Sequence, residues 1–176
     1  FNPFFIPKLF ADIRAGLILM LYGFRGPNFA TLSAFASSTN AIADAFNYIR
    51  LGKANALVTG GAESAVSLAS IGGFNAMNAL STRNDSAETA SRPFSASRDG
   101  FVMGEGSGCL VLEELEHALA RGANIYCEVA GVGMPADAYH LTAAHPDGLG
   151  AKLVMRNALE DAEMQPGEID YINVHG

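Results

Sequence analysis

The sequence has few of the residues that mark nucleic-acid-binding or disulfide-rich proteins. Eleven Lys and Arg residues stand against eighteen Asp and Glu residues, which gives a net charge of −7. A surface that neutralises phosphates needs a basic stripe, and none is visible, so a nucleic-acid partner is excluded. The only two cysteines, Cys109 and Cys127, have neither CxxC nor Cys/His spacing. This favours free thiols in a reducing compartment over a disulfide framework.

No apolar run is long enough to cross a membrane. The most apolar stretch, residues 17–22, is bounded by Gly16 and Gly23. A bilayer needs about 20 consecutive apolar residues, and no cleavage site of the signal-peptide type follows the stretch. We therefore expect no membrane association, and a buried helix or a subunit contact at residues 17–22.

The hydrophobic content of 49% over 176 residues is sufficient for a sizeable core, in one domain or in part of a larger one. The sequence starts without methionine and stops at His175 and Gly176, directly after an expected core strand. Domain termini usually lie in exposed, loosely held segments, so we expect an excised fragment of a longer protein.

Strand and helix signals alternate along the chain. Apolar residues recur at helical spacing after Phe35, and Gly52 follows as a stop signal. The pattern predicts strands at 30–34, 56–59, 109–112, 125–132 and 169–174, and helices at 36–52, within 65–80, at 113–121 and at 151–162. Such alternation predicts a layered α/β fold with a mostly parallel, buried sheet.

Phe35 lies at the sharp turn between the first expected strand and the first expected helix. Many acyl-transfer enzymes present their nucleophile at such a turn. A phenyl ring cannot act as a nucleophile, so the scaffold of an enzyme is expected here without its reacting group.

Two other patterns do not indicate ligand sites. The glycine-rich residues 104–108 precede an expected strand, whereas a phosphate site needs a helix N-terminus behind its glycines. His140 and His145 are five residues apart, a spacing that does not place two imidazoles on one helical face. We expect no metal site and no cofactor.

Six motifs in one order resemble the signature of the β-ketoacyl-acyl-carrier-protein synthases, the condensing enzymes of type II fatty acid synthesis. They are YGFRGPN at 22–28, TGGAE at 59–63, ALSTRN at 79–84, SRPF at 91–94, RDGFVMGEG at 98–106 and NVHG at 173–176. None is specific alone, but the ordered string spans the chain from end to end.

The resemblance implies a thiolase fold, a layered α-β-α-β-α sandwich that this fragment covers in part. Residues 1–122 would be the latter part of the N-terminal half, and residues 123–176 the start of the C-terminal half. The resemblance also implies a cytoplasmic homodimer that works with acyl carrier protein, on acyl and malonyl thioesters, without a cofactor.

The resemblance also implies the roles of four residues. Phe35 matches the family's nucleophilic cysteine, whose thiolate is favoured by the positive end of the following helix. His175 matches the first of two histidines that donate hydrogen bonds to the malonyl thioester carbonyl. Thr142 resembles a threonine near the malonyl end, and Phe74 a pocket-lining residue; for both, simple core packing is the alternative.

The departures from the family pattern leave three hypotheses. The chain is a synthase with an altered nucleophile, whose Phe35 ring could imitate an occupied site. In the second hypothesis, the chain is a non-catalytic partner subunit like the chain-length factors. In the third, it is a decarboxylase that acts on malonyl carrier protein without condensation. Asn78 stands where some relatives carry a basic residue for the carrier protein, which leaves the docking surface open.

Overall fold

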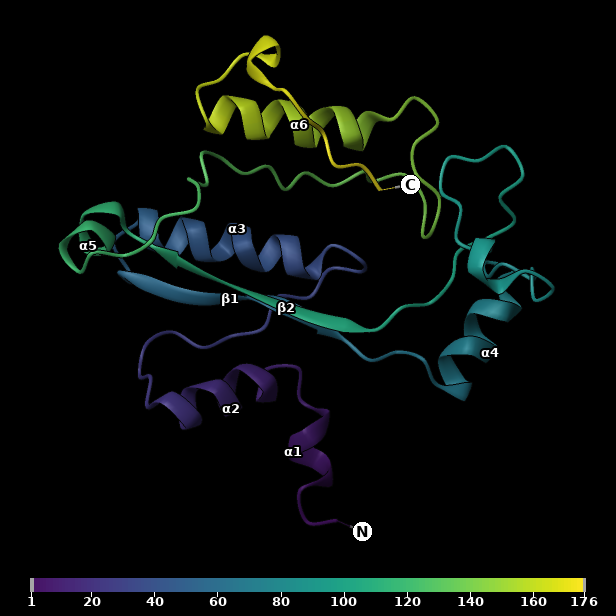
Figure 1. The fold of residues 1–176 in the computed structure, drawn as a ribbon, viewed down its shortest axis with the longest axis horizontal. Coiled ribbons are helices and arrows are strands. Elements are labelled where there is room, and N and C mark those ends of the chain that lie inside the picture. The colour runs from purple at the N-terminus through teal and green to yellow at the C-terminus, as the bar shows by residue number, and fades with distance from the viewer. Residues whose placement is uncertain (1, 176) are drawn as a thin grey trace. The chain divides into compact units, whose positions relative to one another are not determined.

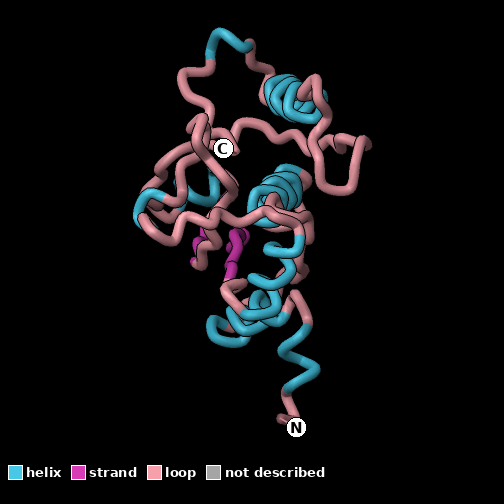
Figure 2. The backbone as a smooth tube through the Cα atoms, turned by 90° about the vertical axis from the view of Figure 1, so that its right-hand side faces the viewer, coloured by secondary structure: helices cyan, strands magenta, loops and turns pink. Residues whose placement is uncertain are grey.

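The computed structural model describes residues 2–175 as helices, one pair of strands and long loops (Figures 1 and 2). The elements in chain order are α1 (Phe5–Leu9), α2 (Ile13–Tyr22), α3 (Ser37–Arg50), β1 (Ala56–Glu63), α4 (Leu68–Ala76), η1 (Ala87–Thr89), β2 (Gly106–Glu113), α5 (Leu115–Ala120), α6 (Leu149–Asp161) and η2 (Pro166–Glu168). They belong to two compact units. The first contains the chain up to Gly61 together with Cys109–Glu168, and the second contains Ala62–Gly108 together with the residues from Ile169.

Helix α3 confirms the first predicted helix, including its stop. Its buried residues are Ala43 and Ala45. After Arg50 the backbone turns left-handed at Gly52, where φ is 66°. The Gly52 N–H then donates to the Ile49 carbonyl and the Lys53 N–H to the Tyr48 carbonyl, each at 2.9 Å. These two bonds form a Schellman motif, which explains why a glycine ends this helix.

The expected helices near 65–80, 113–121 and 151–162 are present as α4, α5 and α6. Local capping accounts for two of them. The Ser67 hydroxyl accepts from the Ser70 N–H at the start of α4, and the Glu114 carboxylate accepts from the His117 N–H at the start of α5. Gly122 has φ of 68° just after α5, as its predicted stop role requires.

The two strands run in opposite directions. Strands β1 and β2 form a two-stranded sheet, and the Glu114 N–H donates to the Asn55 carbonyl at 2.9 Å. This bond places the end of β2 beside the start of β1, so the pair is antiparallel. The mostly parallel sheet predicted from the sequence is therefore wrong for the described residues.

Three predicted strands, at 30–34, 125–132 and 169–174, are loops in the structure. A strand forms only when a neighbouring strand supplies partners for its N–H and C=O groups. Among residues 2–175 these segments have no such ladder. Their apolar composition is typical of strands, but composition does not show whether a neighbouring strand is present to pair with them.

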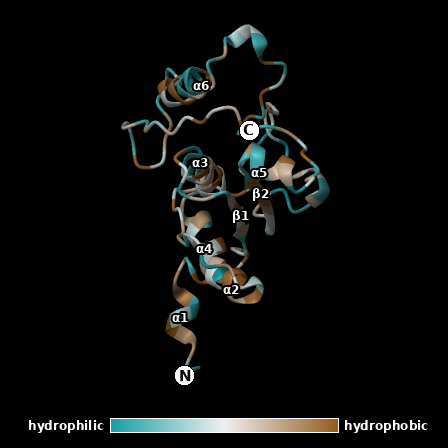
Figure 3. Cartoon of the chain, turned by 90° about the vertical axis from the view of Figure 1, so that its left-hand side faces the viewer, coloured by the Kyte–Doolittle hydropathy of each residue, from teal (hydrophilic) through white to brown (hydrophobic). Residues whose placement is uncertain are grey.

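Residues 17–22 lie in a helix, as predicted, but the helix is not buried within this chain. Helix α2 ends at Gly23, which has φ of 68°. Leu17, Met20 and Leu21 are more than half exposed. Figure 3 shows α1 and α2 as predominantly apolar ribbons. No helix in the described part of the chain is long and apolar enough to cross a membrane.

Candidate functional site

Phe35 occupies a tight turn directly before α3, as the sequence predicted. Its φ is 60°, a left-handed conformation that a non-glycine residue adopts at a cost of about 1–2 kcal/mol. The Ala36 N–H donates to the Ser33 carbonyl at 3.0 Å and so closes the turn. The Phe35 side chain is 81% exposed in this chain. The turn therefore projects the side chain of residue 35 outward at the start of a helix.

The sequence interpretation missed the contacts that hold this turn. The Ser37 hydroxyl accepts from the Ser33 N–H at 2.9 Å and donates to the Ser33 carbonyl at 2.6 Å. The Thr31 hydroxyl donates to the Asp44 carboxylate in α3 at 2.5 Å. The sequence signal that could have indicated these contacts is the pair Ser33 and Ser37, which are four residues apart on either side of Phe35.

Thr142 lies in an exposed loop organised by His140. The N–H groups of Thr142 and Ala143 both donate to Nδ1 of His140, at 3.2 and 3.1 Å. Asp137 accepts from the His145 N–H at 2.8 Å, and His145 accepts from the Asp147 N–H. Both imidazoles thus use Nδ1 to order the backbone of the loop. No group of three or more potential metal ligands occurs among residues 2–175.

Phe74 belongs to the second unit and packs within it. Its ring meets that of Phe101 edge to face, with centroids 5.1 Å apart and planes at 82°. Such aromatic pairs stabilise a small apolar cluster. The contact holds the Phe74 ring within the second unit, where Phe74 is half-buried.

His175 also belongs to the second unit, in a segment without helix or strand. The four predicted site residues are thus divided between the two units, with Phe35 and Thr142 in the first.

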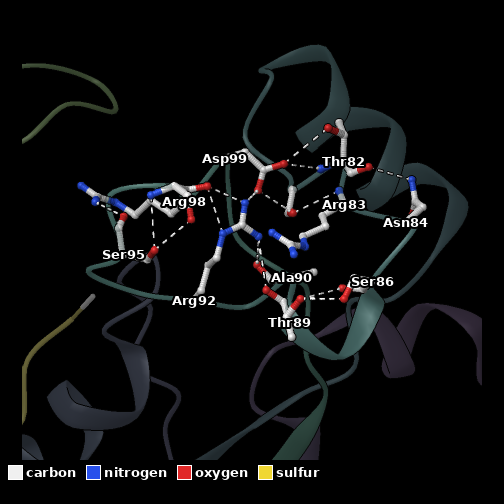
Figure 4. A network of polar contacts seen from close by, with 12 residues as sticks. Thr82, Arg83, Asn84, Ser86, Thr89, Ala90, Arg92, Ser95, Arg98 and Asp99 are labelled. Atoms are coloured by element: carbon white, nitrogen blue, oxygen red, sulfur yellow. Dashed lines mark hydrogen bonds and ion pairs between the residues drawn. The ribbon is translucent and has the colours of Figure 1, made fainter.

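The irregular region 81–99 is held by a polar network around Asp99 (Figure 4). The Asp99 carboxylate accepts from the Ser81 hydroxyl at 2.7 Å, from the Thr82 N–H at 3.1 Å and from Arg92 at 3.0 Å. The Ser81 hydroxyl bond, the Thr82 amide and the Arg92 charge lower the pKa of Asp99. Arg92 also donates to the carbonyls of Ser97 and Thr89. The network fixes a loop that has little secondary structure.

Comparison with known proteins gives matches over nearly the whole chain. Residues 1–118 match the N-terminal domain of β-ketoacyl synthases, and residues 126–176 match the C-terminal domain. The 3-oxoacyl-[acyl-carrier-protein] synthase 2 of Staphylococcus aureus is 50% identical over 175 residues, which are 99% of this chain and 43% of that protein.

Solved structures agree with this result. A β-ketoacyl synthase from Burkholderia phymatum matches with a TM-score of 0.87 and 41% identity, over 94% of this chain and 40% of that one. A type II polyketide ketosynthase, bound to its acyl-carrier protein and a hexaketide, matches with a TM-score of 0.86 and 37% identity over 89% and 39%. A chain of the complex between a ketosynthase and its chain length factor from Xenorhabdus doucetiae matches with a TM-score of 0.80 and 31% identity over 95% and 38%.

The chain spans about two fifths of the length of these relatives. The structural matches confirm the predicted fold class, since these neighbours are thiolase-fold ketosynthases. The ordered motifs, the turn before α3 and the two domain matches lead to one conclusion: the chain belongs to the β-ketoacyl synthase family.

Proposed function

We propose that the protein is built as a 3-oxoacyl-acyl-carrier-protein synthase and that Phe35 makes it inactive in condensation. One observation carries the proposal. In a chain 50% identical to such a synthase, the left-handed turn at the start of α3 holds a phenyl ring at the position that resembles the family's cysteine. The helix end favours a thiolate at this turn, but phenylalanine has no sulfur.

The chemistry of the parent reaction explains what Phe35 removes. A cysteine thiolate attacks the acyl thioester, and the carrier thiolate leaves. Malonyl carrier protein then loses carbon dioxide, and the carbanion attacks the enzyme-bound thioester and releases the cysteine. His175 would donate a hydrogen bond to the malonyl carbonyl oxygen, where negative charge builds during decarboxylation. Without sulfur at position 35 the first bond cannot form.

The other assignments are part of the same proposal. Residues 1–122 and 123–176 belong to the two halves of the thiolase fold, which the separate domain matches support. Acyl carrier protein is the partner, as the polyketide ketosynthase complex suggests, and the active assembly is a homodimer. Thr142 lies near the malonyl group and Phe74 near the acyl pocket. The free cysteines Cys109 and Cys127 support a cytoplasmic location.

Restoring sulfur at position 35 tests the proposal. In the full-length protein, Phe35→Cys should gain the mass of an acyl group from acyl carrier protein and should form 3-oxoacyl product with malonyl carrier protein. Phe35→Ala, which removes the ring without adding a nucleophile, is the matched control and should gain neither. Failure of Phe35→Cys to become acylated in the folded protein would contradict the proposal.

A second candidate is a non-catalytic subunit of a ketosynthase heterodimer. The phenyl ring at position 35 and the match to a complex containing a chain length factor favour it. Co-purification with a cysteine-bearing homologue, together with no activity of Phe35→Cys alone, would support this candidate over the first.

A further inference from the structure

We propose that Ser37 is a positioning residue for the side chain and N–H of residue 35. The inference rests on the proposed function, in which position 35 holds the reacting group. Its basis is the pair of hydrogen bonds between the Ser37 hydroxyl and the Ser33 backbone, which span the turn that contains Phe35.

The geometry makes Ser37 the side chain that braces this turn. One hydroxyl both accepts the Ser33 N–H at 2.9 Å and donates to the Ser33 carbonyl at 2.6 Å. The same carbonyl accepts the Ala36 N–H at 3.0 Å. Three hydrogen bonds thus tie Ser33 to the two residues that follow Phe35, and residue 35 is the middle of the closed loop.

A brace is required here because the local preferences oppose the turn. Residue 35 is a non-glycine residue with φ of 60°, which is unfavourable unless surrounding contacts hold it. The residue at the N-cap, Ala36, has no side chain that could accept a backbone N–H of α3. Ser37 therefore supplies the hydroxyl hydrogen bonds to the Ser33 backbone. The side chains of Phe35 and Ala36 have no polar atom that could form them.

The consequence concerns the direction of a reacting group at position 35. A displacement of a reacting group by about 1 Å is enough to reduce the rate of the catalysed step about a hundredfold. With the Ser37 hydroxyl in place, the left-handed backbone has one arrangement, so the side chain and N–H of residue 35 leave the turn in fixed directions. Without the Ser37 hydroxyl, the backbone of residue 35 can relax toward the φ/ψ regions that non-glycine residues favour.

Amide hydrogen exchange on the full-length protein tests this. Ser37→Ala should speed exchange of the Ser33 and Ala36 amides about tenfold, and Ser37→Thr, which keeps the hydroxyl, should restore the parent rates. Thr39→Ala is the matched control, because it removes a hydroxyl from an exposed residue two positions further along α3 that does not span the turn. Unchanged exchange at both amides, or equal acceleration at Ala43 and Ala45 inside α3, would overturn the proposal.

A second readout follows the reactivity of a thiol at position 35. In Phe35→Cys, the pH dependence of alkylation by iodoacetamide should show a thiol that reacts below its ordinary pKa near 8.5. Adding Ser37→Ala should move the titration toward that value, and adding Ser37→Thr should not. Identical titrations in all three would count against positioning by Ser37. Neither readout needs acyl transfer, so loss of condensation alone would count only against the proposed function.

Discussion

Arg50 and Asp161 lie 111 positions apart, yet Nη1 of Arg50 donates to Oδ1 of Asp161 at 2.6 Å. The other oxygen of Asp161 accepts the Val132 N–H at 2.9 Å. One carboxylate at the end of α6 therefore holds both the end of α3 and the loop at 125–132. The Arg50 guanidinium also stacks on the Phe46 ring, 4.8 Å from its centroid, and this limits its rotamers.

We expect Asp161→Ala to lower the melting temperature of the full-length protein by about 2–4 °C, and Arg50→Ala by less. Asp161→Ala leaves the part-buried Val132 N–H without its acceptor. Arg50→Ala instead removes an exposed ion pair, an exposed hydrogen bond to Asn47 and the contact with the Phe46 ring. Asp161→Asn is the informative control, because its amide oxygen can still accept the Val132 N–H but carries no charge. If Asp161→Asn and Asp161→Ala have the same melting temperature, the hydrogen bond from the Val132 N–H contributes nothing to stability.

Gly131 should not tolerate a side chain. A Cβ atom there would lie 2.6 Å from the Ala162 nitrogen and 2.7 Å from the Ala158 carbonyl oxygen of α6. We expect Gly131→Ala to reduce the free energy of unfolding by about 1–3 kcal/mol, measured by urea denaturation. Gly16→Ala in α2, where the space is open, should be neutral or stabilising. Equal effects of the two changes would contradict this close approach.

The carboxylate of Glu113 should remain ionised in acid. The hydrogen bonds from Arg121 and His117 lower its pKa from 4.5 to about 2. Because the folded-state pKa is lower than the unfolded one, the stabilisation by Glu113 is complete above about pH 4.5 and is lost as the pH falls toward 2. The stability difference between the parent and Glu113→Gln, measured by denaturation, should shrink over this window. Glu116→Gln, at a neighbouring exposed glutamate, is the matched control for the loss of one negative charge from α5.

Asp99 should determine the order of the loop 81–99. Asp99→Ala removes the acceptor of Ser81, Thr82 and Arg92, so the Thr82 amide should exchange about tenfold faster. Because the pKa of Asp99 is lowered, the parent loop should keep its protection at neutral pH and lose it only as the pH falls below 3.8. Protection of Thr82 that survives Asp99→Ala would show that other contacts order the loop.

His175 should matter for decarboxylation even without a nucleophile at position 35. If the full-length protein with Phe35 releases carbon dioxide from malonyl carrier protein, His175→Ala should reduce the rate about a hundredfold, because a donor to the developing negative charge is lost. Thr142→Ala, at the other proposed malonyl contact, should mainly raise KM. An unchanged rate in His175→Ala would remove His175 from the proposed chemistry.

Part of the fold could be predicted because its causes are local. Helices α3 and α5 follow from apolar spacing, and each is followed by a glycine with positive φ, Gly52 and Gly122. The turn at Phe35 could be predicted as well, from its place before a helix. The family could be recognised because motifs keep their order along the chain whatever their spatial positions are.

The sequence by itself determined helices α3, α5 and α6, the turn that carries Phe35 and the family. Tertiary structure decided which apolar segments became strands, since residues 125–132 need a neighbour for their N–H and C=O groups and have none among the described residues. It also decided the pairing of Arg50 with Asp161 and the bracing of Ser33 by Ser37. Spacing along a chain specifies the face of a helix, whereas a hydrogen bond depends on distances that only folding sets.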